Sequence, residues 1–125
     1  MSPWTDMTAS GESYQTMAGI DPVLDIKYMD AIVNAYTKGE NLKDPLISPL
    51  FADFKGFPPV YIQVGENEIL YSDSLRLYEN LKEAGGKAKV DEFPGMWHVF
   101  QMSPVKAAKT AMVNVAEFVF DTFNL

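Results

Sequence analysis

The stretch PVYIQVGENEILYSDSLRLYENLKEAGGKAKVDEF, residues 59–93, decides the fold. It opens with a nearly continuous apolar run at 59–65, which predicts a strand covered on both faces. Apolar residues at helical spacing follow, and Gly85-Gly86 is expected to end that helix. Alternating residues at 87–93 predict a second strand. A strand–helix–strand unit of this kind is a right-handed parallel crossover, so the predicted fold class is α/β, with parallel strands joined by crossover helices.

Two further helices are predicted outside this unit. One is expected to begin at Asp21-Pro22 and to stop at Gly39, and the other to run from Ser103-Pro104 to Phe123. Apolar positions three or four residues apart mark one face of each helix: Leu24, Tyr28, Ile32 and Tyr36 in the first helix, and Val105, Ala108, Met112, Val115, Val119 and Phe123 in the second.

The composition excludes several classes of protein. The 125 residues fit one domain, and 47% hydrophobic with 22% charged residues is typical of a globular chain. Without cysteine, disulfide scaffolds and thiolate chemistry are excluded. A net charge of −7 argues against nucleic-acid binding. No apolar run approaches a membrane span, and MSPWTDMTAS lacks the features of a signal peptide, so we expect a cytoplasmic protein.

The predicted sheet is too small to stand alone. The strand at 59–65 reads as interior and needs a neighbour on each side, but only the strand at 87–93 is evident. A two-stranded parallel sheet is not independently stable. We therefore expect self-association, or pairing with a complementary chain, through the open edge of the sheet.

Two polar residues follow the predicted strands. Glu68 comes after the first, and His98, which is the single histidine, comes after the second. Ligand and catalytic groups gather beyond the carboxyl ends of parallel strands. A carboxylate can fix the tautomer of an imidazole and stabilise its cation. A solitary loop histidine is more often structural, however, so the residues alone leave both interpretations open.

Longer sequence motifs favour the catalytic interpretation. The chain resembles the C-terminal part of the hormone-sensitive-lipase-like branch of the α/β-hydrolase fold, and the resemblance covers essentially all of it. Five words in family order carry this resemblance: Ser2-Pro3-Trp4-Thr5-Asp6, Asp44-Pro45-Leu46-Ile47-Ser48-Pro49-Leu50, Gly56-Phe57-Pro58-Pro59, Tyr61-Ile62-Gln63-Val64-Gly65-Glu66-Asn67-Glu68-Ile69-Leu70 and Phe93-Pro94-Gly95-Met96-Trp97-His98-Val99-Phe100.

The resemblance implies a serine esterase whose triad runs in the order serine, acid, histidine. It implies that Glu68 is the acid and that His98 is the general base and then the general acid. Many family members carry aspartate at the position that matches Glu68. Asp73 is a rival acid, although the dipole of the predicted helix also explains an aspartate in its first turn.

The nucleophile that the family needs is missing from these residues. The G-x-S-x-G and His-Gly-Gly words of the family both lie upstream of Ser2, and Gly11-Glu12-Ser13-Tyr14-Gln15 lacks the second glycine. Residues 1–125 are thus expected to be a partial domain that is inactive by itself. Completed by an N-terminal half, it would hydrolyse small short-chain acyl esters with no cofactor or metal. The alternative is a catalytically inactive fragment or interaction module that pairs through the open sheet edge.

Overall fold

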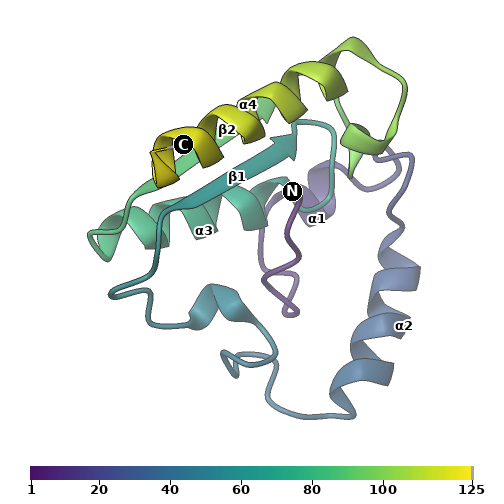
Figure 1. The fold of residues 1–125 in the computed structure, drawn as a ribbon. Helices are drawn as coiled ribbons and strands as arrows, with labels where there is room; N and C mark the ends of the chain where they lie inside the picture. The colour runs from purple at the N-terminus through teal and green to yellow at the C-terminus, as the bar shows by residue number, and fades with distance from the viewer. Residues whose placement is uncertain (125) are drawn as a thin grey trace.

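The computed structural model describes residues 1–124, and its centre is a two-stranded parallel sheet (Figure 1). The helices, 3₁₀ turns and strands follow one another as α1 (Ser13–Thr16), α2 (Ile26–Thr37), η1 (Pro49–Phe51), β1 (Val60–Gly65), α3 (Tyr71–Glu83), β2 (Ala88–Phe93), η2 (Phe100–Met102) and α4 (Lys106–Phe123). The predicted α/β class is confirmed, and both strands lie within one residue of their expected bounds.

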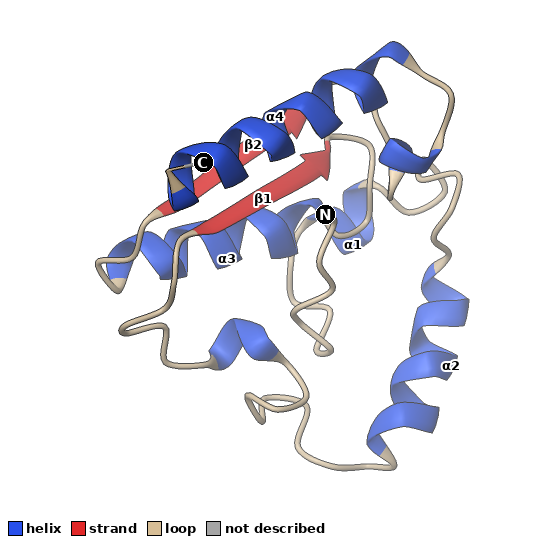
Figure 2. Cartoon of the chain, viewed as in Figure 1, coloured by secondary structure: helices blue, strands red, loops and turns tan. Residues whose placement is uncertain are grey.

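The two strands run in register and end together. Val60 lies opposite Ala88, and Gly65 lies opposite Phe93. Helix α3 makes the crossover that parallel strands require, as the colouring by secondary structure shows (Figure 2). The loops that follow Gly65 and Phe93 therefore leave the sheet at the same edge.

Helices cover both faces of the sheet. Ile62 packs with Leu81 of α3 in a buried apolar cluster. Gln63 follows it in the strand and so points to the opposite face, where its Nε2 donates to the carbonyl of Ala111 in α4 at 2.7 Å. The glutamine that interrupts the apolar run is fully buried, and its amide is satisfied by a helix backbone.

Helix α2 begins later than predicted because its cap is Asp25 and not Asp21. The Asp25 carboxylate accepts a hydrogen bond from the Lys27 N–H at 2.8 Å. Asp21 instead stabilises the turn that precedes the helix, where its Oδ1 accepts a backbone N–H. Its Oδ2 accepts the N–H of Ile69 at 3.0 Å. The last helix also starts later, at Lys106, since residues 103–105 are not helical.

The apolar face of α2 is largely exposed in the structure of residues 1–124. Tyr28, Ile32 and Tyr36 are 75%, 54% and 64% exposed, and Figure 1 shows that α2 lies away from the sheet. Met29 of this helix is buried and packs in an apolar cluster with Tyr14. The helical periodicity was real, but residues 1–124 cover only a narrow part of its apolar surface.

Helix α4 shows the same pattern. Ala108 and Ala111 are buried against the histidine loop, because small side chains let the helix approach closely. Met112, Val119 and Phe123, which belong to the predicted apolar stripe, are 48%, 39% and 68% exposed. Despite this apolar surface, neither α4 nor any other helix within residues 1–124 is long and apolar enough to cross a membrane.

Candidate active site

The loops after the two strands touch through their backbones. The N–H of Glu66 donates to the carbonyl of Phe93 at 3.1 Å, and the N–H of Asn67 donates to the carbonyl of Met96 at 2.9 Å. Gly65 permits this approach, because a Cβ atom there would lie only 2.4 Å from the Met96 carbonyl oxygen. Glycine at the end of β1 is therefore a requirement of the loop contact.

The structure brings the two predicted site residues together. Oε2 of Glu68 lies 3.0 Å from Nδ1 of His98. The Glu68 side chain is fully buried, and that of His98 is 17% exposed. The other carboxylate oxygen, Oε1, accepts hydrogen bonds from the hydroxyl of Ser2 at 2.9 Å and from the N–H of Gly65 at 2.6 Å. Each oxygen of this buried carboxylate thus has a partner.

This arrangement assigns the protons of the imidazole. An ionised carboxylate only accepts hydrogen bonds, so Nδ1 of His98 carries the proton that points to Glu68. The neutral ring then has a free lone pair on Nε2. Within residues 1–124, no side chain or backbone group makes a hydrogen bond with Nε2. A histidine held in this way can take up a proton at Nε2 while the carboxylate stabilises the resulting cation.

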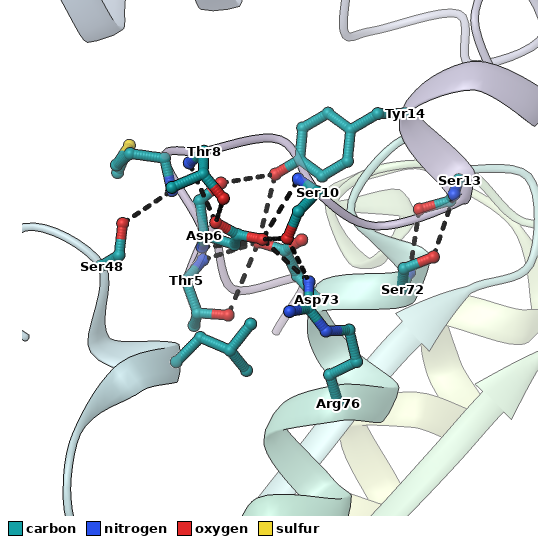
Figure 3. Close-up of polar contacts among 12 residues, drawn as sticks. Thr5, Asp6, Thr8, Ser10, Ser13, Tyr14, Ser48, Ser72, Asp73 and Arg76 are labelled. Carbon is teal, nitrogen blue, oxygen red and sulfur yellow. Dashed lines mark hydrogen bonds and ion pairs between the residues drawn. The ribbon is translucent and has the colours of Figure 1, made fainter. Parts of the chain in front are cut away.

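Asp73, the rival acid, lies in a different buried site (Figure 3). Its Oδ2 accepts the backbone N–H groups of Thr5 and Asp6, both at 2.9 Å, and lies 3.2 Å from the hydroxyl of Tyr14. Its Oδ1 is buried without a partner among residues 1–124. Burial raises the pKa of Asp73 to about 6, although the two backbone donors oppose this effect. The contacts make Asp73 an anchor for the N-terminal segment, and its carboxylate makes no hydrogen bond with His98.

Asp6 lies beside Asp73 and is held differently. The hydroxyls of Thr8 and Ser10 each lie 2.5 Å from its carboxylate, and Nη1 of Arg76 lies 2.8 Å away (Figure 3). Burial alone would raise the pKa of Asp6, but the hydrogen bonds from Ser10, Thr8 and Arg76 outweigh it and hold the pKa below 3.8. The N-terminal segment is therefore fixed to α3 through two neighbouring carboxylates.

Ser13, in the word nearest to G-x-S-x-G, is buried in a structural contact. Its hydroxyl donates to the carbonyl of Ile69 at 2.5 Å and accepts the N–H of Ser72 at 2.9 Å. Ser72 returns the contact by accepting the N–H of Ser13 at 2.9 Å (Figure 3). No serine hydroxyl within residues 1–124 makes a hydrogen bond with His98.

Ser2 contacts the candidate pair but was not among the predicted site residues. Its hydroxyl contacts Glu68, which lies 66 positions away along the chain, and no spacing rule could have found that contact. The only signal was its place in the Ser2-Pro3-Trp4 word. As for metals, residues 1–124 contain no group of three or more histidine and acidic side chains that could hold an ion.

The sequence of this chain is similar to those of known hydrolases. A family model described as the alpha/beta hydrolase fold matches residues 1–102. An esterase of Acinetobacter venetianus is 39% identical over 121 residues, which are 94% of this chain and 40% of that protein. An acetyl-hydrolase of Streptomyces hygroscopicus is 34% identical over 80% of this chain and 33% of its own length.

Solved structures agree. An esterase from the bacterial hormone-sensitive lipase family is 38% identical and superimposes with a TM-score of 0.92, over 98% of this chain and 42% of that one. The esterase EstE5, soaked with p-nitrophenyl butyrate, is 34% identical and superimposes with a TM-score of 0.92. The match covers 99% of this chain and 42% of that one. The chain spans about 40% of the length of such relatives. By sequence and by structure, then, the chain is similar to esterases and acetyl-hydrolases, and it belongs to the α/β-hydrolase fold family.

Proposed function

We propose that this chain supplies the acid and the histidine of a Ser-Glu-His triad in a carboxylic-ester hydrolase. The observation that carries the proposal is the 3.0 Å contact between Oε2 of Glu68 and Nδ1 of His98, made by a carboxylate whose other oxygen also has its partners. Glu68 is the acid and His98 the base, while Asp73 is an anchor.

The residues would act in two half-reactions. In the first, Nε2 of His98 takes the proton of a serine hydroxyl as its oxygen bonds to the ester carbonyl carbon, and then gives that proton to the departing alkoxide. In the second, Nε2 takes a proton from water, the hydroxide attacks the acyl-serine, and the proton returns to the serine oxygen. Glu68 stabilises the imidazolium in both halves through Nδ1.

The serine and the oxyanion-binding groups must come from residues outside this sequence, which contains no G-x-S-x-G. The edge of β1 opposite β2 supports such a partner, because no strand within residues 1–124 pairs with it. Val60 donates its N–H to Lys87 beside β2, so alternate residues of β1 face β2, and Tyr61 and Gln63 face the other way. Within residues 1–124, Ser2 N–H occupies the Gln63 carbonyl on this edge at 2.8 Å, and Glu68 Oε1 accepts the Gly65 N–H at 2.6 Å. A further parallel strand fits on this edge.

Short-chain acyl esters are the proposed substrates. This choice follows the relatives, since one is an acetyl-hydrolase and another was soaked with p-nitrophenyl butyrate. The chain alone is expected to be inactive on such esters.

A second candidate is a non-catalytic interaction module. The observation that favours it is the exposed apolar surface of α2 and α4 together with the open β1 edge. On this proposal the chain binds a second copy of itself or a complementary chain, without hydrolysis.

A chimera separates the two candidates. The 125 residues replace the matching part of the Acinetobacter esterase, and hydrolysis of p-nitrophenyl butyrate is measured. His98→Ala and Glu68→Gln should each remove most of the activity, whereas Glu66→Gln, on the same loop, should leave it nearly unchanged. Activity that survives His98→Ala would overturn the triad proposal. A folded chimera without activity would favour the interaction module.

A further inference from the structure

We propose that Ser2 is a positioning residue for the acid–histidine pair. Its hydroxyl joins the loop that carries Glu68 to the backbone that follows His98. The inference rests on the proposed function and deepens it, because it names a group that acts on the reaction only through Glu68 and His98.

The contacts of the hydroxyl form a bridge. Ser2 is 4% exposed, and its Oγ donates its one proton to Oε1 of Glu68 at 2.9 Å. A lone pair of the same oxygen faces the N–H of Val99 at 3.4 Å. One buried hydroxyl thus contacts both loops of the candidate site.

Unusual backbone conformations lie at both ends of this bridge. Ser2 has φ of 40° and Val99 has φ of 49°. Residues other than glycine rarely adopt the left-handed region, and for a β-branched valine it is an outlier. Such conformations persist where surrounding contacts over-determine them, and they gather at functional sites.

Ser2 is held by contacts that do not involve Glu68. Its N–H donates to the Gln63 carbonyl at 2.8 Å. A few residues further on, Thr5 and Asp6 donate their N–H groups to Asp73 (Figure 3). The segment is therefore fixed at two points. These contacts hold the Ser2 hydroxyl in place as a hydrogen-bond donor to the Glu68 carboxylate.

The consequence concerns Oε2, the oxygen of Glu68 that contacts His98. Oε1 has two donors, Ser2 Oγ and Gly65 N–H, and this leaves Oε2 aligned on Nδ1 of His98. Without the hydroxyl, Oε1 keeps one donor and the carboxylate gains freedom to rotate. The imidazole should then hold its proton less firmly on Nδ1.

The test uses the full 125-residue chain and needs no catalysis. His98 is the single histidine, so its ring nitrogen signals in ¹⁵N NMR are unambiguous and report the tautomer. Ser2→Gly removes the hydroxyl in a residue that tolerates positive φ. The ratio of the Nδ1–H to the Nε2–H tautomer should fall about 5-fold, which corresponds to the loss of one hydrogen bond of about 1 kcal/mol. Ser74→Ala is the matched control, because the Ser74 hydroxyl is buried without a partner among residues 1–124.

The tautomer ratio of His98 decides the inference. An unchanged tautomer ratio in a folded Ser2→Gly variant would overturn it. Should that variant not fold, Ser2→Cys keeps the volume with a weak donor, and its ratio must fall in the same direction. In the active chimera, Ser2→Gly should lower kcat with KM unchanged. If the parent chimera is inactive, the proposed function fails, while the tautomer ratio still decides whether Ser2 orients His98.

Discussion

Arg76 places its Nη1 2.8 Å from Oδ2 of Asp6, and it makes no such bond with Asp73, the second buried carboxylate of the same network. Burial raises the pKa of both acids, but at Asp6 the hydrogen bonds from Ser10, Thr8 and Arg76 outweigh it. The pKa of Asp6 lies below 3.8, and that of Asp73 is raised to about 6. Their effects on stability against pH have opposite signs.

Asp73→Asn should stabilise the protein at neutral pH. Because the folded-state pKa of about 6 lies above the ordinary 3.8, the folded protein binds more protons than the unfolded chain between these values. Stability is lost as pH rises through this window, by up to about 3 kcal/mol once Asp73 is ionised. The free energy of unfolding of the variant, measured by urea unfolding, should exceed that of the parent by most of this amount above pH 7 and by little at pH 4. Glu79→Gln on the same helix is the control, and an Asp73→Asn variant that is less stable than its parent at pH 8 would contradict the prediction.

Arg76→Met should act in the other direction. The depressed pKa of Asp6 means that its contribution is present above pH 3.8 and is lost as pH falls through its folded-state pKa. Removing the guanidinium removes a hydrogen bond to a charged acceptor and should cost about 1–3 kcal/mol at pH 7. The difference from the parent should shrink at pH 3. Lys82→Met, at an exposed position of α3, should change the unfolding free energy little at either pH.

Gly65→Ala should displace the histidine loop. The added Cβ would meet the Met96 carbonyl oxygen at 2.4 Å, and a backbone atom cannot yield as a side chain does. A loss of about 1–3 kcal/mol is expected, with a clear change in the ¹⁵N signals of His98. Gly19→Ala, in open space at φ of 75°, carries backbone strain without a clash. It should leave the His98 signals unchanged, and equal changes in both variants would refute the packing argument.

Lysine substitutions at the exposed apolar residues Ile32 and Tyr36 of α2 should reduce self-association of the chain. Ile32→Lys with Tyr36→Lys removes apolar side chains that are 54% and 64% exposed. Sedimentation should show a lower association constant, with an unfolding free energy within about 0.5 kcal/mol of the parent. Ala31→Lys with Asn34→Lys adds the same charge to exposed positions of the same helix without removing large apolar groups. If both double variants associate alike, net charge and not the apolar stripe controls association.

Local patterns predicted the β1–α3–β2 unit well, because a buried apolar run, a helical period and an alternating strand each leave a signal in neighbouring residues. They also placed Glu68 and His98 after adjacent strands, and parallel pairing brought them together. The start of α2 was predicted wrongly at Asp21, because Asp21 and Asp25 both carry a carboxylate that can cap a helix.

Other features depend on distant contacts, which the local pattern does not contain. The periodicity of α2 marks an apolar face but not what covers it, so the outward direction of Tyr28 could not be foreseen. The role of Asp73 depends on backbone groups of Thr5 and Asp6, more than 60 positions away along the chain. A dipole argument explained an aspartate there and missed its function as an anchor.

The bridge made by Ser2 has a consequence for the order in which the protein folds. The β1–α3–β2 unit closes short loops, whereas the contacts of Ser2 with Glu68 and Val99 span 66 and 97 positions. Contacts that close long loops form late, because the chain loses the entropy of loop closure before the contact contributes any stabilising free energy. The acid and histidine can thus meet early, in a nascent αβ unit, and their final alignment awaits the arrival of the N-terminal segment.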